Sequence, residues 1–242
     1  MIAGSPGREP ARATVLPPAR IRAHVLVPVA FADGFATTAR VFTFDELADG
    51  REHLALGLGN RSAAPGPGVC DGDPTPTRLH SECLTGDVFG SGRCDCGAQL
   101  RESVERLDAS GGFLLYLRQE GRGIGLYPKL DAYVLQDEGL DTYEANRALG
   151  YAEDERDYTV AAQMLRALGE TRVALLSNNP DKAAQLATLG VEIVERVPTA
   201  AHLSTSNGRY LAAKVRHGHH LLPLRLTPDE REPAAGSGAC HR

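Results

Sequence analysis

The sequence contains 242 residues, of which 42% are hydrophobic and 24% charged, and its formal net charge is −5. This is the composition of an ordinary globular protein, and the negative charge argues against a general nucleic-acid-binding protein, which needs a basic face. No apolar run approaches the roughly 18 residues that span a bilayer, and Pro, Gly and Arg interrupt the N-terminal region where an export signal would lie, so we expect a cytoplasmic protein without a membrane partner.

The two ends of the chain differ from the middle in composition. Residues 1–20 are rich in Pro, Ala and Arg without hydrophobic periodicity, which predicts a disordered leader, and residues 227–242 predict a flexible tail for the same reason. Cys70 and Cys240 lie in loop-like sequence without a partner at ligand spacing, and we interpret them as incidental thiols. The histidine-rich stretch 216–220 is interpreted as a surface cluster. The residues between the two ends are enough for one domain.

Strands and one helix are predicted in the first half of this domain. Residues 21–31 and 36–44 are rich in β-branched and aromatic side chains, which is typical of strands. The stretch 97–112 repeats apolar residues at helical spacing and ends in two glycines, so it predicts a helix. GFLLYLRQ (112–119) is a compact apolar run between turn signals and predicts a buried strand.

The second half alternates between helical and strand patterns. In chain order, it predicts helices over 129–139, 142–150 and 157–169, a strand over 171–177, a helix over 178–190 and a strand over 191–198. The last helix has Pro180 near its first turn, where proline is tolerated. Strand, helix and strand in this order predict a right-handed crossover with parallel pairing. We therefore expect an α/β fold, a single domain with a mixed β-sheet flanked by helices.

Three of the five cysteines fall close together, at Cys83, Cys94 and Cys96. A reducing cytoplasm makes a disulfide the weakest explanation, and soft thiolates favour zinc or an iron–sulfur cluster. A closed structural zinc site needs four ligands, and His80 would be the candidate for the fourth. Three protein ligands with a fourth position left for water are instead the composition of a catalytic zinc, and this is the interpretation that we favour.

Three further motifs are glycine-rich or polar. RQEGRGIGLY (118–127) has alternate glycines that allow close approach of the backbone to a ligand, although a plain loop is an equal alternative. SNNPDK (177–182) lies where a strand meets a helix, so its N–H groups and lysine suit a phosphate, with N-capping by Asn179 or Ser177 as the alternative. EDERD (153–157) is by composition a solvated acidic turn. The sequence has no P-loop motif, so a triphosphate would be held in another way.

These motifs occur together in one known family. They are, along the chain, RLHSECLTGD, RCDCGAQL, RQEGRGIGL, DTYEANRALG, DERDYT and SNNPDK. In this order and approximate spacing the chain resembles GTP cyclohydrolase II, the zinc enzyme that opens the riboflavin pathway. The resemblance covers about residues 78–198, and six linked motifs make it highly specific. It implies a catalytic domain over 21–226, GTP as the small-molecule substrate and a homodimer.

The resemblance also assigns roles to individual residues. The zinc ligands, for one Zn²⁺ per chain, would be Cys83, Cys94 and Cys96. The catalytic residues would be Asp154, Arg156 and Tyr133. The residues lining the GTP site would be Arg78, His80, Glu82, Gln99, Glu120, Gly121, Arg122, Thr142, Ser177 and Lys182.

The implied reaction is a zinc-dependent hydrolysis of GTP. It opens the guanine imidazole ring at C8 and releases formate and pyrophosphate, to give 2,5-diamino-6-(5-phosphoribosylamino)pyrimidin-4-one. Tyr133 would donate or relay a proton to a departing ring nitrogen. Mg²⁺ would accompany the triphosphate, with Arg156 acting either as a covalent nucleophile that Asp154 deprotonates or as an electrostatic stabiliser.

Two other functions stay open from the sequence. A paralogue in specialised nucleoside metabolism would open the ring but keep the formyl group, and a non-catalytic zinc- or nucleotide-binding module would bind GTP without chemistry. The chain departs from the family pattern at Arg101, where an acidic residue is common, and at Pro128, where Asn is expected.

Overall fold

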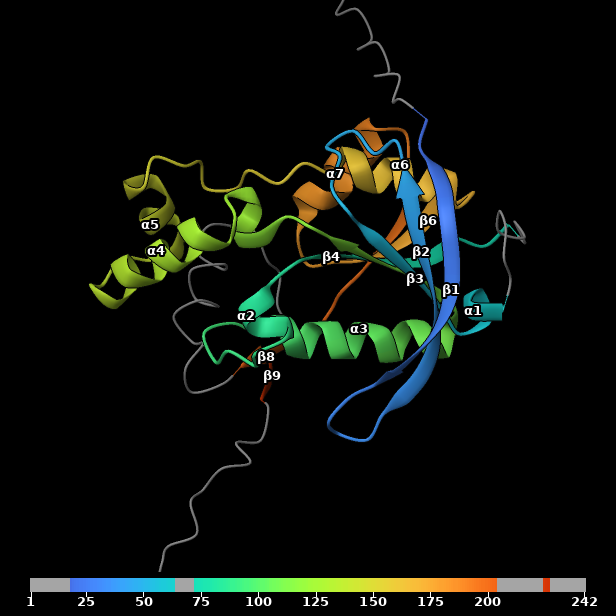
Figure 1. Cartoon of the computed structure of the whole chain (residues 1–242), viewed down its shortest axis with the longest axis horizontal. Helices are drawn as coiled ribbons and strands as arrows, with labels where there is room; N and C mark the ends of the chain where they lie inside the picture. Colours follow the sequence, from blue (N-terminus) through green and yellow to red (C-terminus); the bar gives the residue numbers. More distant parts are fainter. Residues whose placement is uncertain (1–17, 64–71, 204–223, 227–242) are drawn as a thin grey trace, which may run out of the picture.

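The computed structural model describes residues 18–63, 72–203 and 224–226 of the chain (Figure 1). The predicted tail, most of the predicted leader, Cys70, Cys240 and the stretch 216–220 lie outside this part. Within the described residues, no helix is both long enough and apolar enough to cross a membrane.

Strands and helices follow the chain in the order that the sequence patterns indicate, with additions. The strands are β1 (Arg20–Ala30), β2 (Ala36–Asp45), β3 (Leu54–Leu58), β4 (Thr75–Ser81), β5 (Gly112–Leu117), β6 (Arg172–Leu176), β7 (Glu192–Val197), β8 (Ala201–Leu203) and β9 (Leu224–Leu226). The helices are α1 (Asn60–Ala63), α2 (Leu84–Asp87), α3 (Cys96–Ser110), the 3₁₀ helix η1 (Glu120–Gly123), α4 (Leu126–Asp137), α5 (Thr142–Ala148), α6 (Thr159–Ala167) and α7 (Pro180–Thr188). β1 begins at Arg20, one residue earlier than expected.

Seven of the described strands form one mixed sheet, in the order β1-β2-β3-β5-β4-β6-β7. The pairs β1–β2, β2–β3 and β3–β5 are antiparallel, whereas β5–β4, β4–β6 and β6–β7 are parallel. β6, α7 and β7 make the parallel strand–helix–strand unit that the sequence predicts. The expected α/β fold with a mixed sheet is confirmed.

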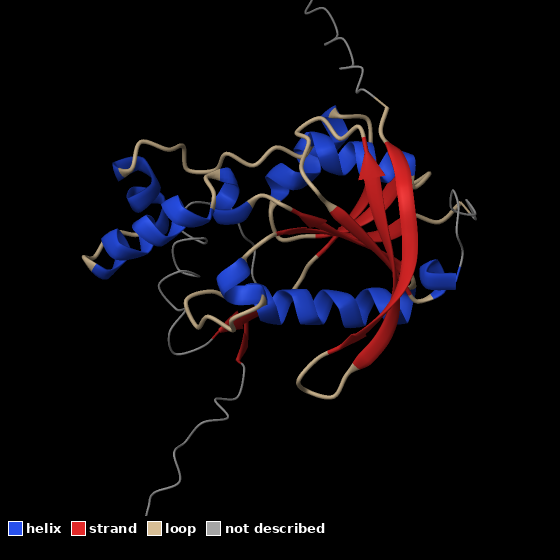
Figure 2. Cartoon of the chain, viewed as in Figure 1, coloured by secondary structure: helices blue, strands red, loops and turns tan. Residues whose placement is uncertain are grey.

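Helices cover both faces of the sheet, with α3 on one side and α6 and α7 on the other (Figures 1 and 2). The side chains of β5 alternate between these layers because successive residues of a strand point to opposite faces. Phe113 and Leu115 belong to the core cluster that contains Leu165 of α6, while Leu114 belongs to the cluster that contains Leu107 of α3. The two clusters share the sheet, so the fold is a single domain.

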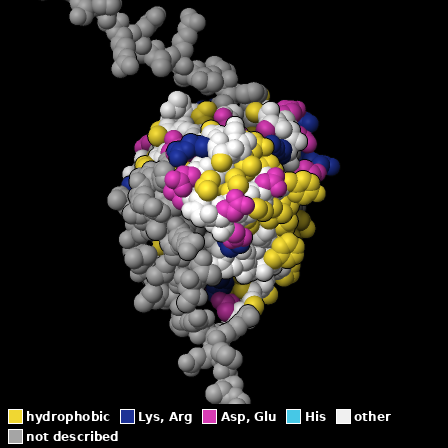
Figure 3. Space-filling model, turned by 90° about the vertical axis from the view of Figure 1, so that its left-hand side faces the viewer, with side chains coloured by type: hydrophobic (Ala, Val, Ile, Leu, Met, Phe, Trp, Pro, Cys, Tyr) yellow, Lys and Arg dark blue, Asp and Glu magenta, His cyan; other side chains and the backbone are white. Residues whose placement is uncertain are grey.

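The helical hairpin of α4 and α5 stands to one side of the sheet (Figure 2). Figure 3 views the molecule from this side and shows hydrophobic side chains gathered on part of its surface. The exposed large hydrophobic side chains include Tyr127, Leu130 and Val134, which are spaced along one stripe of α4. This stripe of α4 therefore contributes little to the core, and the other face of the helix remains for the site described next.

Candidate active site

Three parallel strands end at the same edge of the sheet, and a cavity lies there. Cys83 follows β4, Glu120 follows β5 and Ser177 follows β6. Carboxyl ends of parallel strands are where open α/β sheets bind ligands. The cavity has a volume of about 1150 Å³, including space open to solvent. With the exception of Asp154, every residue that the sequence proposed for the site lines this cavity. These lining residues are Arg78, His80, Glu82, Cys83, Cys94, Cys96, Gln99, Glu120, Gly121, Arg122, Tyr133, Thr142, Arg156, Ser177 and Lys182.

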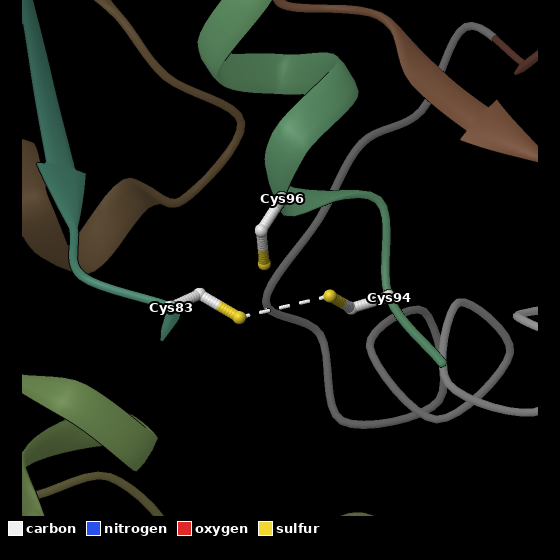
Figure 4. A group of neighbouring side chains, drawn as sticks. All are labelled: Cys83, Cys94 and Cys96. Atoms are coloured by element: carbon white, nitrogen blue, oxygen red, sulfur yellow. Dashed lines mark hydrogen bonds between the residues drawn. The ribbon is translucent and has the colours of Figure 1, made fainter. Parts of the chain in front are cut away.

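The three cysteines meet at the wall of this cavity. Cys83 arrives from the end of β4, and Cys94 and Cys96 from the start of α3, so that the sulfur atoms point toward one another (Figure 4). All three Sγ atoms lie within 4.8 Å of one another, and those of Cys83 and Cys94 are 3.7 Å apart. Two thiolates of a tetrahedral zinc with Zn–S bonds of about 2.3 Å are separated by roughly 3.8 Å. The cluster therefore has the donor atoms and the spacing for one zinc ion.

The glycine at position 86 leaves the room that the thiols occupy. A Cβ at Gly86 would lie 2.7 Å from Sγ of Cys94 and 3.1 Å from Sγ of Cys83. Such distances are shorter than van der Waals contact, so the turn of α2 can wrap the thiols only without a side chain at this position.

The thiols share negative charge unequally. Hydrogen bonds from Cys94 and Cys96, together with the ammonium of Lys129, hold the pKa of Cys83 far below its usual value. The pKa of Cys94 is raised to about 11 by the neighbouring Cys83 and by burial, and that of Cys96 is raised as well. Burial and mutual proximity therefore oppose the ionisation of all three thiols together, and a divalent ion is the natural partner that would offset this.

His80 is committed to a different network. Its Nε2 lies 3.1 Å from the carboxylate of Asp87, and its ring stacks on Tyr116 at a centroid distance of 5.5 Å. Burial lowers the pKa of His80 although Asp87 opposes this. The group of possible metal ligands in the described residues contains the three cysteines and not His80. This argues against the closed four-ligand zinc site that the sequence left open.

Arg78 and Gln99 form a chain of hydrogen bonds beside the thiols. Nη2 of Arg78 donates to Oε1 of Gln99 at 3.0 Å, and Nε2 of Gln99 donates to the buried carboxylate of Asp95 at 2.6 Å. Nη1 of Arg78 donates to the carbonyl of Leu176. The amide of Gln99 thus has a protein partner at both ends, and its clearest role is to hold Arg78. Nε of Arg78 is buried with no hydrogen-bond partner among the described residues, so it is a donor available to a ligand.

The glycine loop takes a strained path past the cavity. Arg122 has a φ of 62°, which is unusual for a residue with a side chain, and its guanidinium lies 4.0 Å from the ring centroid of Tyr143. Its carbonyl accepts a hydrogen bond from Glu155 N at 3.0 Å. A Cβ at Gly123 would lie 2.9 Å from the backbone of Glu155, so only glycine fits there. This contact joins the glycine loop to the acidic turn.

The junction of β6 and α7 supplies further polar groups to the cavity. Asn179 is the N-cap of α7 and accepts from Asp181 N at 2.9 Å, while Ser177 Oγ accepts from Asn179 N at 3.1 Å. The capping alternative is therefore present in the structure. Lys182 is 6% exposed and donates to the carbonyl of Leu79 at 2.8 Å. Its ammonium also lies 5.5 Å from the ring centroid of Tyr158, and it brings a buried positive charge to the cavity wall, which suits an anion.

The acidic turn brings Asp154 and Arg156 together. Nε of Arg156 donates to Oδ1 of Asp154 at 2.8 Å, and Nη2 donates to Oδ2. Burial would raise the pKa of Asp154, but the guanidinium outweighs it and lowers that pKa. Arg156 lines the cavity, whereas Asp154 does not. Asp154 is thus placed to act on Arg156.

The hairpin of α4 and α5 closes the remaining side. Tyr133 of α4 and Thr142, the first residue of α5, both line the cavity. Burial raises the pKa of Tyr133, so its hydroxyl keeps its proton at neutral pH. α5 begins with a capping box between Asp141 and Glu144, which fixes the start of the helix where Thr142 sits.

Four residues near the site were not singled out from the sequence, namely Arg93, Asp87, Tyr116 and Lys129. Lys129 lies one helical turn before Tyr133 and donates to Glu120 Oε1 at 2.7 Å and to Cys83 Sγ at 3.1 Å. Its spacing of four from Tyr133 was the available signal, because such residues share a helix face. Burial lowers the pKa of Lys129, but Glu120 and Cys83 outweigh it and raise the pKa.

Neither departure from the family pattern is a residue that lines the cavity. Arg101 pairs with Asp33 at 2.9 Å, and its guanidinium lies 4.0 Å from the ring centroid of Phe35. It anchors the turn between β1 and β2 on α3 and does not line the cavity. Pro128 occupies the first turn of α4, where its missing N–H has no helical partner to lose.

Known proteins resemble this chain over most of its length. A family model described as GTP cyclohydrolase II matches residues 26–198. The GTP cyclohydrolase-2 of Vibrio parahaemolyticus is 52% identical over 186 residues, which are 77% of this chain and 90% of that protein, and that of Vibrio cholerae is 51% identical over the same shares. The riboflavin biosynthesis protein RibBA of Bacillus cereus is 48% identical over 188 residues, which are 77% of this chain and 45% of that protein.

Proposed function

The chain belongs to the GTP cyclohydrolase II family of enzymes, which open the ring of GTP for riboflavin biosynthesis, and we propose the residues and products of its reaction. The reaction consumes GTP and water and yields formate, pyrophosphate and 2,5-diamino-6-(5-phosphoribosylamino)pyrimidin-4-one. The observation that carries the proposal is a cavity with a cluster of three thiols at one end and Arg156 and Lys182 among its other lining residues.

Cys83, Cys94 and Cys96 would hold one Zn²⁺ per chain. Their spacing fits a single ion, and the room that Gly86 leaves supports this role. When bound, the ion would supply an activated water for hydrolysis at C8 of guanine, first of the ring and then of the formamide.

The residues around the thiols would orient the purine. Candidates for direct contact are the donors and acceptors of Arg78, Glu82, Glu120, Gly121 and Arg122, while Gln99 would act by holding Arg78 and His80 by shaping the wall of the cavity. Among them, the buried Nε of Arg78 is a donor in need of a partner, which supports contact with a substrate acceptor. Tyr133 lines the cavity and carries a phenol that is protonated at neutral pH, so it is proposed to deliver its proton to the departing ring nitrogen.

Four other lining residues would bind the triphosphate together with Mg²⁺. Arg156 and Lys182 supply positive charge, and Thr142 and Ser177 supply hydroxyls. Arg156 is proposed to stabilise the α-phosphoryl group electrostatically while water breaks the phosphoanhydride. Its ion pair supports this role over a covalent one, because the lowered pKa of Asp154 makes that carboxylate a weaker base toward a guanidinium.

The direct test is to incubate zinc-loaded protein with GTP and Mg²⁺ and to assay formate, pyrophosphate and the diaminopyrimidine chromophore. All three are expected in equal amounts. Loss of GTP without formate would identify the product as a formamidopyrimidine instead. Tight GTP binding with no turnover would identify a non-catalytic module. Metal analysis of the purified protein, with one zinc per chain expected, tests the ligand assignment separately.

The proposals for the oligomeric state and the cellular location rest on the family resemblance. We propose a cytoplasmic homodimer, and light scattering of the purified protein is the test of the assembly. A mass of one chain in solution would contradict it.

A further inference from the structure

Lys129 contacts both the metal-binding thiols and the glycine loop, and the proposed reaction gives it no role. Its ammonium lies 3.1 Å from Sγ of Cys83, 3.0 Å from Oγ1 of Thr85 and 2.7 Å from Oε1 of Glu120. These partners come from two different segments, one following β4 and the other following β5, while Lys129 belongs to α4. One side chain therefore ties three elements together at the metal-binding thiols.

Glu120 is held firmly on its other sides. Its Oε2 accepts a hydrogen bond from Leu84 N at 2.7 Å, and its Oε1 accepts from Gly121 N at 3.0 Å. The carboxylate thus bridges the segment that begins at Cys83 and the glycine loop. The position of Glu120 relative to Cys83 depends on these bonds and on the shared ammonium.

The ion pair is little exposed to water. The side chains of Lys129 and Glu120 are 11% and 9% exposed, so solvent screens their attraction weakly. Removing one partner of such a pair leaves a buried charge without compensation, which is more damaging than the loss of a surface contact. Lys129 therefore compensates the buried charge of the Glu120 carboxylate, and Glu120 in turn holds the glycine loop through Gly121 N.

We propose that Lys129 is a positioning residue that fixes the Cys83 thiolate and the Glu120 carboxylate relative to each other and so couples the metal-binding thiols to the glycine loop. It donates a proton in a hydrogen bond to a metal-ligand sulfur, and such outer contacts orient ligands and tune the metal. The inference rests on the proposed function for the roles of zinc and of Glu120.

The test uses Co²⁺ in place of zinc, because Co²⁺–thiolate charge-transfer bands report the electron density on sulfur. A hydrogen bond withdraws density from the thiolate, so Lys129→Leu is expected to move the band to lower energy. We also expect the affinity for zinc, measured by competition with a chelating dye, to fall by about 10- to 100-fold. A band and an affinity equal to those of the unaltered protein would overturn the proposal.

Three further variants make the result specific. Lys129→Arg keeps a cationic donor and is expected to restore much of the band position. Asp131→Asn removes a charge from the same helix at an exposed position outside the cavity, and it should change neither quantity. Thr85→Val removes one anchor of the ammonium while leaving Lys129 in place, and a smaller shift in the same direction is expected. If Lys129→Leu does not fold, an unshifted band in Thr85→Val would overturn the proposal by itself.

Kinetics separate this role from general damage. Loss of the Glu120 position should raise KM for GTP, and loss of the Cys83 position should lower kcat, so we expect both to change in Lys129→Leu. The Co²⁺ measurement needs no nucleotide. If the unaltered protein does not turn over GTP, the proposed function fails while the role of Lys129 is still tested.

Discussion

The guanidinium of Arg93 lies over the ring of Tyr133, with its central carbon 4.8 Å from the ring centroid, and it also pairs with Asp137 at 2.8 Å. Arg93 directly precedes Cys94, whereas Tyr133 and Asp137 lie one turn apart on α4. The loop that leads into the metal-binding thiols therefore packs on the tyrosine proposed as proton donor. The orientation of that phenol depends on a residue outside its own helix.

Replacing Arg93 should leave the phenol of Tyr133 less firmly oriented. A cation over an aromatic ring at an exposed site stabilises by about 0.5–1 kcal/mol, so Arg93→Gln is expected to lower kcat roughly 2- to 5-fold. Tyr133→Phe, which removes the proton itself, should lower kcat by about 100-fold or more. Asp137→Asn loses the ion pair but keeps the cation over the ring, and its kcat should lie between that of Arg93→Gln and the unaltered protein. An unchanged kcat in Arg93→Gln would mean that α4 alone orients the phenol.

The metal-binding cluster can be disturbed without touching a thiol. A Cβ at Gly86 would lie 2.7 Å from Cys94 Sγ, so Gly86→Ala is expected to push the sulfur atoms apart. We expect zinc content to fall well below one per chain and turnover to fall with it. Val88→Ala, at an exposed position in the same loop, is the matched control and should retain its zinc. Full zinc occupancy in Gly86→Ala would show that the turn can move without loss of the site.

The fold and the site were predictable to different extents. The strand–helix–strand unit that ends in β7 could be read from apolar periodicity, because its elements are regular and bounded by Pro180 and Gly190. β4 was not predicted, since TPTRLHS carries buried polar and charged residues, of which Arg78 and His80 line the cavity while Thr75 bonds with Glu170. A strand that delivers Arg78 and His80 to a site cannot show the pattern of a core strand.

The same limit applies to individual side chains of the site. The thiols could be grouped from spacing alone, because Cys94 and Cys96 are nearly adjacent and Cys83 is one loop away. The contact of Lys129 with Cys83 joins residues 46 positions apart and could not be seen without the fold. Gln99 shows the opposite case: its motif predicted a residue that lines the GTP site, and it does line the cavity, but its two protein partners favour a role in holding Arg78.

The role of Arg156 can be tested by comparing a variant that keeps its positive charge with one that removes it. If it stabilises the phosphoryl group electrostatically, Arg156→Lys should keep part of the turnover and Arg156→Gln should lose about 100-fold or more. Mass spectrometry of protein quenched during turnover should then show no nucleotide attached to the chain. A covalent guanylyl adduct on the unaltered protein that is missing from Arg156→Gln would instead establish the arginine as a nucleophile.

Glu102 should make the stability of the protein depend on pH. It accepts hydrogen bonds from His202 Nε2 at 2.9 Å, from Ala200 N at 3.2 Å and from Arg106 Nη1 at 3.2 Å, and so ties the segment after β7 to α3. Burial would raise the pKa of this carboxyl, but the hydrogen bonds outweigh it and lower the pKa from 4.5 to about 2. A lowered pKa stabilises the fold at pH values above about 4.5, and this contribution is lost as the pH falls toward 2.

The contribution at neutral pH is on the order of 1–3 kcal/mol. Glu102→Gln should therefore lower the free energy of unfolding in urea at pH 7 by this amount. The difference from the unaltered protein should shrink between pH 4.5 and pH 2, because the carboxyl becomes neutral in both states of the unaltered protein. Glu105→Gln, on the same helix with a side chain 59% exposed, is the matched control and should change stability little. A difference that stays constant with pH would show that Glu102 acts through packing rather than through its charge.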